Sequence, residues 1–159
     1  MSIRYCLDTS VFINSWQQHY RIDVFPAVWT ALDGLICDGR VISCLEVYAE
    51  LEKQHDDLFA WAKARKKLFE IPTRETTDEM TALMGRFPNF AAAGGTANAA
   101  DPWLIAHAKV SDAVVVTFEQ FQERSRPTKP PKIPNVCIDL GMRWLSPIDF
   151  FAETNISFA

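Results

Sequence analysis

Several features that define whole classes of proteins are missing from this sequence. No apolar run approaches the roughly 20 residues needed to span a bilayer, and the first residues lack the basic-then-apolar pattern of a secretion signal. The four cysteines form no Cys-x-x-Cys pair, and the three histidines have no neighbouring ligand at metal spacing. We therefore expect a cytoplasmic protein with reduced cysteines and with neither a membrane segment nor a zinc site.

Positive charge is also scarce. The chain has 16 Lys and Arg against 20 Asp and Glu, a formal net charge of −4, which argues against a general nucleic-acid coat protein. An enzyme that acts on nucleic acid through a bound cation is not excluded, because acids gathered at one site would make the total negative. The 159 residues, 48% of them hydrophobic, predict a single globular domain over 1–159.

Short apolar runs alternate with stretches of helical periodicity. Strands are expected at 3–7, 40–43, 113–118 and 135–140 with a short extended piece at 69–72, and helices at 10–19, 24–38, 43–54, 56–69, from 77 or 78 to 87, and from 101 and 147 onward. This alternation predicts a three-layer α/β/α sandwich with a mainly parallel sheet of four to five strands. Residues 56–90 are expected to form a helical insertion, and 91–100 and 124–134 to be loops.

Five carboxylates stand after predicted strands or at predicted helix starts: Asp8, Glu46, Glu50, Asp101 and Glu119. Each alone has an ordinary interpretation as a turn residue, a cap or a solvated side chain. Together, at the carboxyl edge of a parallel sheet, they would repel one another unless a cation neutralised them. Oxygen ligands in that number suit Mg²⁺ or Mn²⁺.

Two of these acids also fit helix-capping patterns. Ser43-Cys44-Leu45-Glu46 has the form of a capping box, and Asp101-Pro102 has the form of an N-cap followed by a proline. Glu46 and Glu50 lie four residues apart on one helical face, so either could reach the site. The capping box gives Glu46 a structural role, which makes Glu50 the better ligand and leaves Glu46 as the alternative.

Four stretches carry a resemblance to a known family: Tyr5–Ser10, Ile42-Ser43 with Glu50-Leu51, Asp101–Ala108 and Val116–Glu119. In them the sequence resembles the PIN-domain nucleases, and among these a PIN-like branch of bacterial and archaeal proteins of unassigned function. The resemblance covers nearly the whole chain, and its most specific part is Asp101 leading a Leu-Ile-Ala-x-Ala helix. Ser10 departs from the family at a position where Asn is frequent, and Glu119 departs where Asp is usual.

The resemblance implies a metal-dependent endoribonuclease, often the toxin of a type II toxin–antitoxin pair. Asp8, Glu50 and Asp101 would hold Mg²⁺ or Mn²⁺, and the longer Glu119 would support the site, through water. Thr117 would hydrogen-bond a carboxylate or a water. Metal-activated water, and no protein nucleophile, would attack the phosphodiester.

RNA is the expected substrate, and basic residues outside the acids are expected to bind its phosphates. The candidates are Lys66 and Lys67 on a predicted helix, and Arg124, Arg126 and Lys129 beside Lys132 in the proline-rich segment. Further expected partners are an antitoxin encoded nearby and a second copy of the chain. The alternative function is a catalytically weak PIN-fold module that binds RNA or protein. A haloacid-dehalogenase-type phosphatase is disfavoured because it needs a second Asp where Ser10 stands.

Overall fold

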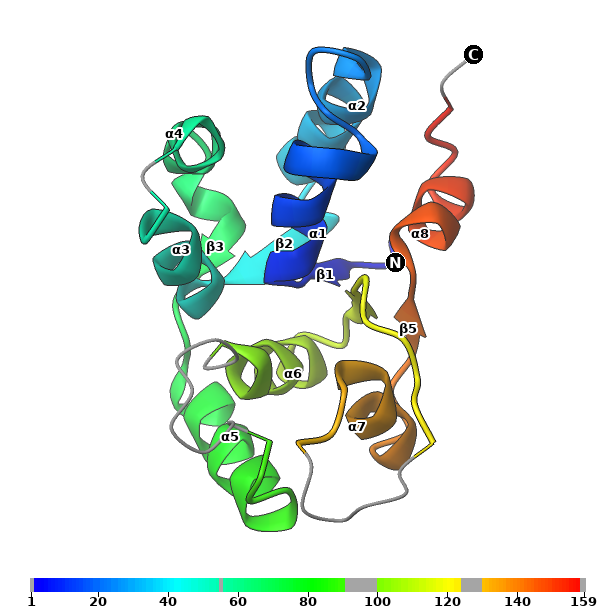
Figure 1. The fold of residues 1–159 in the computed structure, drawn as a ribbon. Helices are drawn as coiled ribbons and strands as arrows, with labels where there is room; N and C mark the ends of the chain where they lie inside the picture. Colours follow the sequence, from blue (N-terminus) through cyan, green and yellow to red (C-terminus); the bar gives the residue numbers. More distant parts are fainter. Residues whose placement is uncertain (1, 55, 91–99, 124–129, 158–159) are drawn as a thin grey trace.

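The centre of the structure, a computed structural model that describes residues 2–54, 56–90, 100–123 and 130–157, is a sheet of parallel strands in the order β3-β2-β1-β4-β5. The strands are β1 (Tyr5–Leu7), β2 (Val41–Cys44), β3 (Phe69–Glu70), β4 (Val114–Val116) and β5 (Trp144–Leu145). Helices cover both faces of this sheet (Figure 1). The predicted three-layer α/β/α sandwich with a parallel sheet is therefore confirmed.

The helices divide between the two faces. On one side lie α5 (Arg74–Arg86), α6 (Asp101–Val110) and α7 (Ile133–Asp139), and on the other lie α1 (Thr9–Asn14), α2 (Pro26–Cys37), α3 (Leu45–Glu52), α4 (Asp57–Lys63) and α8 (Pro147–Glu153) (Figure 1). A π-helix, Ser15–His19, continues α1, and a 3-10 turn, Lys66–Leu68, precedes β3.

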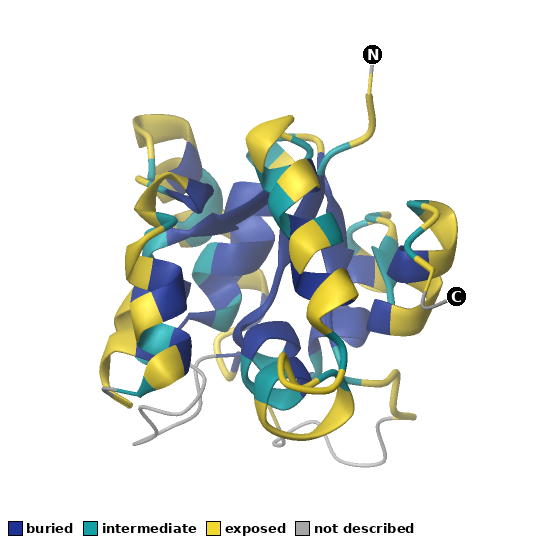
Figure 2. Ribbon diagram, turned by 90° about the horizontal axis from the view of Figure 1, so that it is seen from above, coloured by how far each residue is buried: buried dark blue, intermediate teal, exposed yellow. Residues whose placement is uncertain are grey.

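The core lies between the sheet and its helices, and the central strands β1, β2 and β4 are buried along their whole length (Figure 2). All three residues of β4 are buried, as expected for a strand covered on both faces. β1 is the middle strand, since Cys6 pairs with Ile42 on one side and with Val115 on the other. The carboxyl ends of β1, β2 and β4 therefore meet at one edge. The four cysteines are free, as predicted.

The strand predicted at 135–140 is wrong, because this segment is helix α7. Its buried residues Ile133, Val136 and Cys137 recur at helical spacing, and Pro134 stands in the first turn, where a missing N–H costs nothing. The last strand of the sheet is instead β5. A short apolar run fits a strand or a buried helix equally well by composition, and here the helix prevails.

Several helix boundaries also differ from those predicted. The helix expected from 77 or 78 begins at Arg74, where Thr73 is the N-cap and its hydroxyl accepts the N–H of Thr76 at 3.2 Å. The helix expected over 56–69 ends at Lys63. The segment 56–90 holds α4 and α5, and it also supplies the edge strand β3, which pairs with β2. Residues 91–99 of the predicted loop lie outside the described residues.

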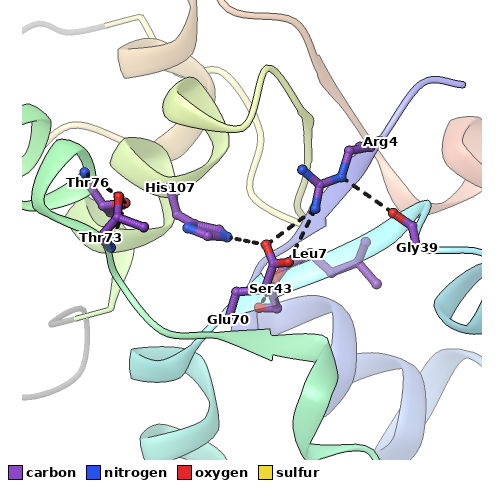
Figure 3. A network of polar contacts seen from close by, with 8 residues as sticks. All are labelled: Arg4, Leu7, Gly39, Ser43, Glu70, Thr73, Thr76 and His107. Atoms are coloured by element: carbon purple, nitrogen blue, oxygen red, sulfur yellow. Dashed lines mark hydrogen bonds and ion pairs between the residues drawn. The ribbon is translucent and has the colours of Figure 1, made fainter. Parts of the chain in front are cut away.

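A polar network ties β3 to the segments around it (Figure 3). Glu70 at the end of β3 accepts hydrogen bonds from Arg4 Nη2 at 3.3 and 3.4 Å, and its Oε1 lies 2.9 Å from Nε2 of the buried His107 on α6. Ser43 is fully buried in β2 and donates to the carbonyl of Leu7 at 2.7 Å.

Candidate metal centre

Four of the five acids singled out in the sequence line one cavity of about 400 Å³: Asp8, Glu50, Asp101 and Glu119. We call this space the acidic cavity. It opens at the carboxyl edge of the sheet, where strand-to-helix connections bring side chains from distant parts of the chain together.

Asp8 is the most deeply placed of the four. It follows β1 directly, its N–H donates to Val116 O at 3.0 Å, and the residue is only 3% exposed. Its Oδ2 accepts the hydroxyl of Ser10 at 2.7 Å and that of Thr117 at 2.9 Å. Two neutral donors therefore fix the orientation of this carboxylate.

The same two hydroxyls organise the segment after β4. Thr117 is fully buried, and its Oγ1 accepts the N–H of Glu119 at 3.0 Å. The hydroxyl of Ser10 accepts the N–H of Phe118 at 3.2 Å. The chain from Thr117 to Glu119 is thereby attached to the turn that carries Asp8, which directs Glu119 into the acidic cavity.

Glu50 lies near the end of α3, and its Oε1 accepts the N–H of Ala100 at 3.2 Å. Glu46 does not line the acidic cavity, and its Oε2 is buried with no hydrogen-bond partner among the described residues. The capping box predicted at Ser43 is wrong: Cys44 is the N-cap, without a side-chain cap, because Ser43 belongs to β2.

Asp101 is the first residue of α6, and Ala100 holds the N-cap position. The prediction of Asp101 as the N-cap is thus wrong by one residue. The error matters for function, because the carboxylate faces the cavity and makes no capping hydrogen bond.

Among the described residues, Glu119 is the one acid of the four with a cation within 4 Å. Its Oε2 accepts the N–H of Ile133 at 3.3 Å, and Nζ of Lys132 lies 3.7 Å from its Oε1. Lys132 belongs to the basic segment recognised in the sequence, but nothing in its local pattern indicated a contact with Glu119.

Burial and mutual repulsion make the four acids hard to ionise together. Burial, together with the charges of Asp8, Glu119 and Glu50, raises the pKa of Asp101 to about 9, while Lys132 opposes the shift. Burial is also the main cause of the raised pKa of Asp8, Glu50 and Glu119. Acids with such pKa values are typical of functional sites.

The donor set suits a hard divalent cation, because it consists of carboxylate oxygens from four elements whose charges oppose one another. Asp8, Glu50 and Asp101 would hold the ion, with Glu119 beside them. In the described part of the chain, no three His, Cys, Asp or Glu side chains are already arranged to hold a metal ion.

Other cavity residues were missed by the sequence analysis: Ile13, Asn14, Lys53 and Gln54. Helical spacing contained a usable signal, since Asn14 follows Ser10 by four residues and Lys53 follows Glu50 by three.

The predicted RNA-binding lysines lie apart from the acids. Lys66 and Lys67 are exposed in the turn before β3 and do not line the acidic cavity. Arg124, Arg126 and Lys129 lie outside the described residues.

A family model described as a domain of unknown function, DUF4411, matches residues 5–158. The chain belongs to this family. No curated protein matches the sequence. Within the residues that the structure describes, the DUF4411 chain has no helix long and apolar enough to cross a membrane.

Solved structures share the fold of this DUF4411 chain. VapBC-1 from nontypeable Haemophilus influenzae superimposes with a TM-score of 0.53 at 15% identity, covering 91% of this chain and 98% of that chain. VapBC2 from Rickettsia felis, bound to a DNA fragment from their promoter, gives 0.52 at 14% identity with the same coverage. The fold is therefore PIN-like, as the sequence resemblance implied.

Proposed function

We propose that this chain is a metal-dependent endoribonuclease that hydrolyses RNA phosphodiester bonds. The observation that carries the proposal is the convergence of Asp8, Glu50, Asp101 and Glu119 on one cavity, with raised pKa values and, among the described residues, only one ion pair within 4 Å. A bound Mg²⁺ or Mn²⁺ would activate water and stabilise charge on the phosphate.

The residues of the chain have separate tasks in this reaction. Asp8, Glu50 and Asp101 would hold the cation, and Glu119 would support the site, directly or through water. Ser10 and Thr117 keep Asp8 oriented by donating to its Oδ2, the role that outer hydrogen bonds play around metal ligands. With its pKa raised to about 9, Asp101 holds a proton at neutral pH in the metal-free protein, and a bound cation would favour its ionised form.

The activity is tested by incubating purified protein with structured RNAs in Mg²⁺, in Mn²⁺ and with chelator. We expect cleavage that requires the ion and is abolished by Asp8→Ala and by Asp101→Ala. Asp57→Ala removes an exposed carboxylate outside the cavity and should cleave normally. Unchanged cleavage by the two cavity variants would overturn the proposal. A protein that binds RNA but shows no Mn²⁺-dependent rise in Tm would be the binding module instead.

We also propose that the chain is the toxin of a type II pair. The support is its likeness to the two VapBC structures, which are toxin–antitoxin structures. Co-expression with the adjacent small gene tests this. A stable complex that suppresses cleavage is expected, and cleavage unaffected by the neighbour would contradict the assignment.

A further inference from the structure

The acidic cavity is larger than a metal ion needs. A hydrated ion of octahedral geometry would be held at the four acids, whereas the cavity of about 400 Å³ has six further lining residues. The lining therefore extends beyond the acids to residues that another group could contact.

Two helices supply the rest of the lining. Residues Ser10, Ile13 and Asn14 come from α1, whereas Glu50 lies on α3, Lys53 is the C-cap of that helix and Gln54 follows it. Asn14 lies one helical turn after Ser10, and Lys53 lies one turn after Glu50, on the side of the acid site. Asn14, Lys53 and Gln54 thus extend the cavity beyond the acids.

These three side chains have a chemistry that the acids lack. Lys53 is the only cationic side chain among the described residues of the lining. Its charge lowers the pKa of Glu50 only as a minor influence, after burial and hydrogen bonds. Asn14 and Gln54 are amides, which both donate and accept hydrogen bonds and so match the edges of nucleobases.

We propose that Asn14, Lys53 and Gln54 form a ribonucleotide subsite. Lys53 binds the phosphate of a nucleotide next to the scissile bond, and the two amide side chains bind the edge of the base of that nucleotide. The subsite rests on the proposed nuclease function, because it places an RNA segment against the acids. It makes Asn14 and Gln54 determinants of sequence preference.

Binding of the four ribonucleoside 5′-monophosphates, measured by calorimetry in saturating Mg²⁺, tests the phosphate contact. Lys53→Met should weaken all four about tenfold, as for a charged hydrogen bond, and Lys53→Arg should restore most of the affinity. Lys63→Met is the matched control, since Lys63 is exposed on α4 and outside the cavity. Lys53→Met should also lower by about one the salt slope of binding to a short single-stranded RNA.

A different result is expected if Lys53 acts only on Glu50. The Mn²⁺ affinity of Lys53→Met, followed by electron paramagnetic resonance, would then change while nucleotide affinity at saturating metal would not. That outcome would overturn the phosphate contact.

The amides are tested by the ratios among the four nucleotides. Asn14→Ala and Gln54→Ala should alter these ratios severalfold, whereas equal losses for all four, or none, would overturn base recognition. The subsite and the nuclease fail separately: nucleotide binding that depends on Lys53 in a protein that cleaves no RNA would overturn the nuclease alone. RNA cleavage with nucleotide affinity independent of Lys53, Asn14 and Gln54 would overturn the subsite alone.

Discussion

Carboxylates at the ends of two strands of the sheet meet very different surroundings. Glu70 at the end of β3 is paired with Arg4 and His107, which come from opposite parts of the chain (Figure 3). Asp8 at the end of β1 shares the acidic cavity with Glu50, Asp101 and Glu119. Among the described residues, only Lys132 brings a positive charge within 4 Å of any of these four.

The surroundings of Glu70 indicate a structural role, and those of the cavity acids indicate a functional one. The contacts of Glu70 join the segment before β1, β3 and α6, so its charge is compensated within the fold. The cavity acids raise one another's pKa, so they oppose folding whenever they ionise without a cation. A chain selected for stability alone would not retain such a group, whereas one that binds a divalent ion needs it.

Substitution of Asp8 should have the largest effect on RNA cleavage. Asp8→Asn should reduce metal-dependent RNA cleavage by more than about 100-fold, since even residues that only support a metal ligand contribute about 10- to 100-fold. The metal-free variant should unfold in urea at the same concentration as the wild type or higher, because a buried charge is removed. Loss of both cleavage and stability would show instead that Asp8 supports the fold as Glu70 does.

The hydroxyl of Thr117 should rank second. Thr117→Val removes its hydrogen bond to Asp8 and should lower cleavage and Mn²⁺ affinity by about 10- to 100-fold. Thr154→Val is the matched control, since Thr154 donates to Phe150 O at 2.8 Å outside the cavity. Both variants should lose about 1 kcal/mol of unfolding free energy. An equal fall in cleavage in both would show that Thr117 does not act through its hydrogen bond to Asp8.

The pKa of Asp101 predicts how stability depends on pH. This pKa is about 9 in the folded protein and about 4 in an unfolded chain. Between these values the folded state holds a proton that the unfolded chain has released, so stability falls as pH rises. The Tm of metal-free protein should fall by roughly 10 °C or more from about pH 5 to about pH 9, because each pH unit in this range costs up to about 1.4 kcal/mol. Asp101→Asn should remove most of this fall, and an unaltered slope would exclude Asp101 as its source.

Glu70 should show the opposite pattern to Asp8. Glu70→Ala leaves the buried Nε2 of His107 without its partner and should cost about 1–2 kcal/mol of unfolding free energy. RNA cleavage per folded molecule should stay within about twofold. Glu75→Ala, an exposed acid on α5, should change stability by less than about 0.5 kcal/mol. A large loss of RNA cleavage in Glu70→Ala would show that Glu70 also supports activity and is not a purely structural carboxylate.

Local sequence was sufficient for four of the five strands and for the gathering of four acids at one edge of the sheet. Apolar runs that end abruptly on polar residues marked β1 and β4, and parallel topology then required Asp8 and Glu119 to lie at one edge. Ser43 shows where local reasoning fails: its hydroxyl fits a capping box, but the fold uses it to bridge β2 to Leu7. The predicted strand at 135–140 failed for a related reason, since burial on both sides hides the period of a short apolar run.

Contacts between residues far apart in the sequence could not be predicted from the sequence. Arg4 and Glu70 are 66 positions apart, and His107 is a further 37 from Glu70. Neither spacing follows a helical or strand period. Lys53 and Asn14 were easier to predict as cavity residues, because one helical turn separates Lys53 from Glu50 and Asn14 from Ser10.

The smallest expected effect on stability and metal binding comes from Lys132. Its ion pair with Glu119 resembles the pairing of Glu70 with Arg4 and His107. An ion pair this exposed contributes at most about 1 kcal/mol, so Lys132→Met should barely change stability. It should raise the pKa of Glu119 and Asp101 further, moving the pH midpoint of Mn²⁺ binding upward. Above that midpoint, Mn²⁺ affinity should increase by about two- to fivefold, because a competing cation is gone. Lys109→Met, which removes a lysine paired with Glu79 away from the cavity, should change neither quantity. Weaker Mn²⁺ binding at every pH would mean that Lys132 helps to assemble the acids and does not compete with the metal for them.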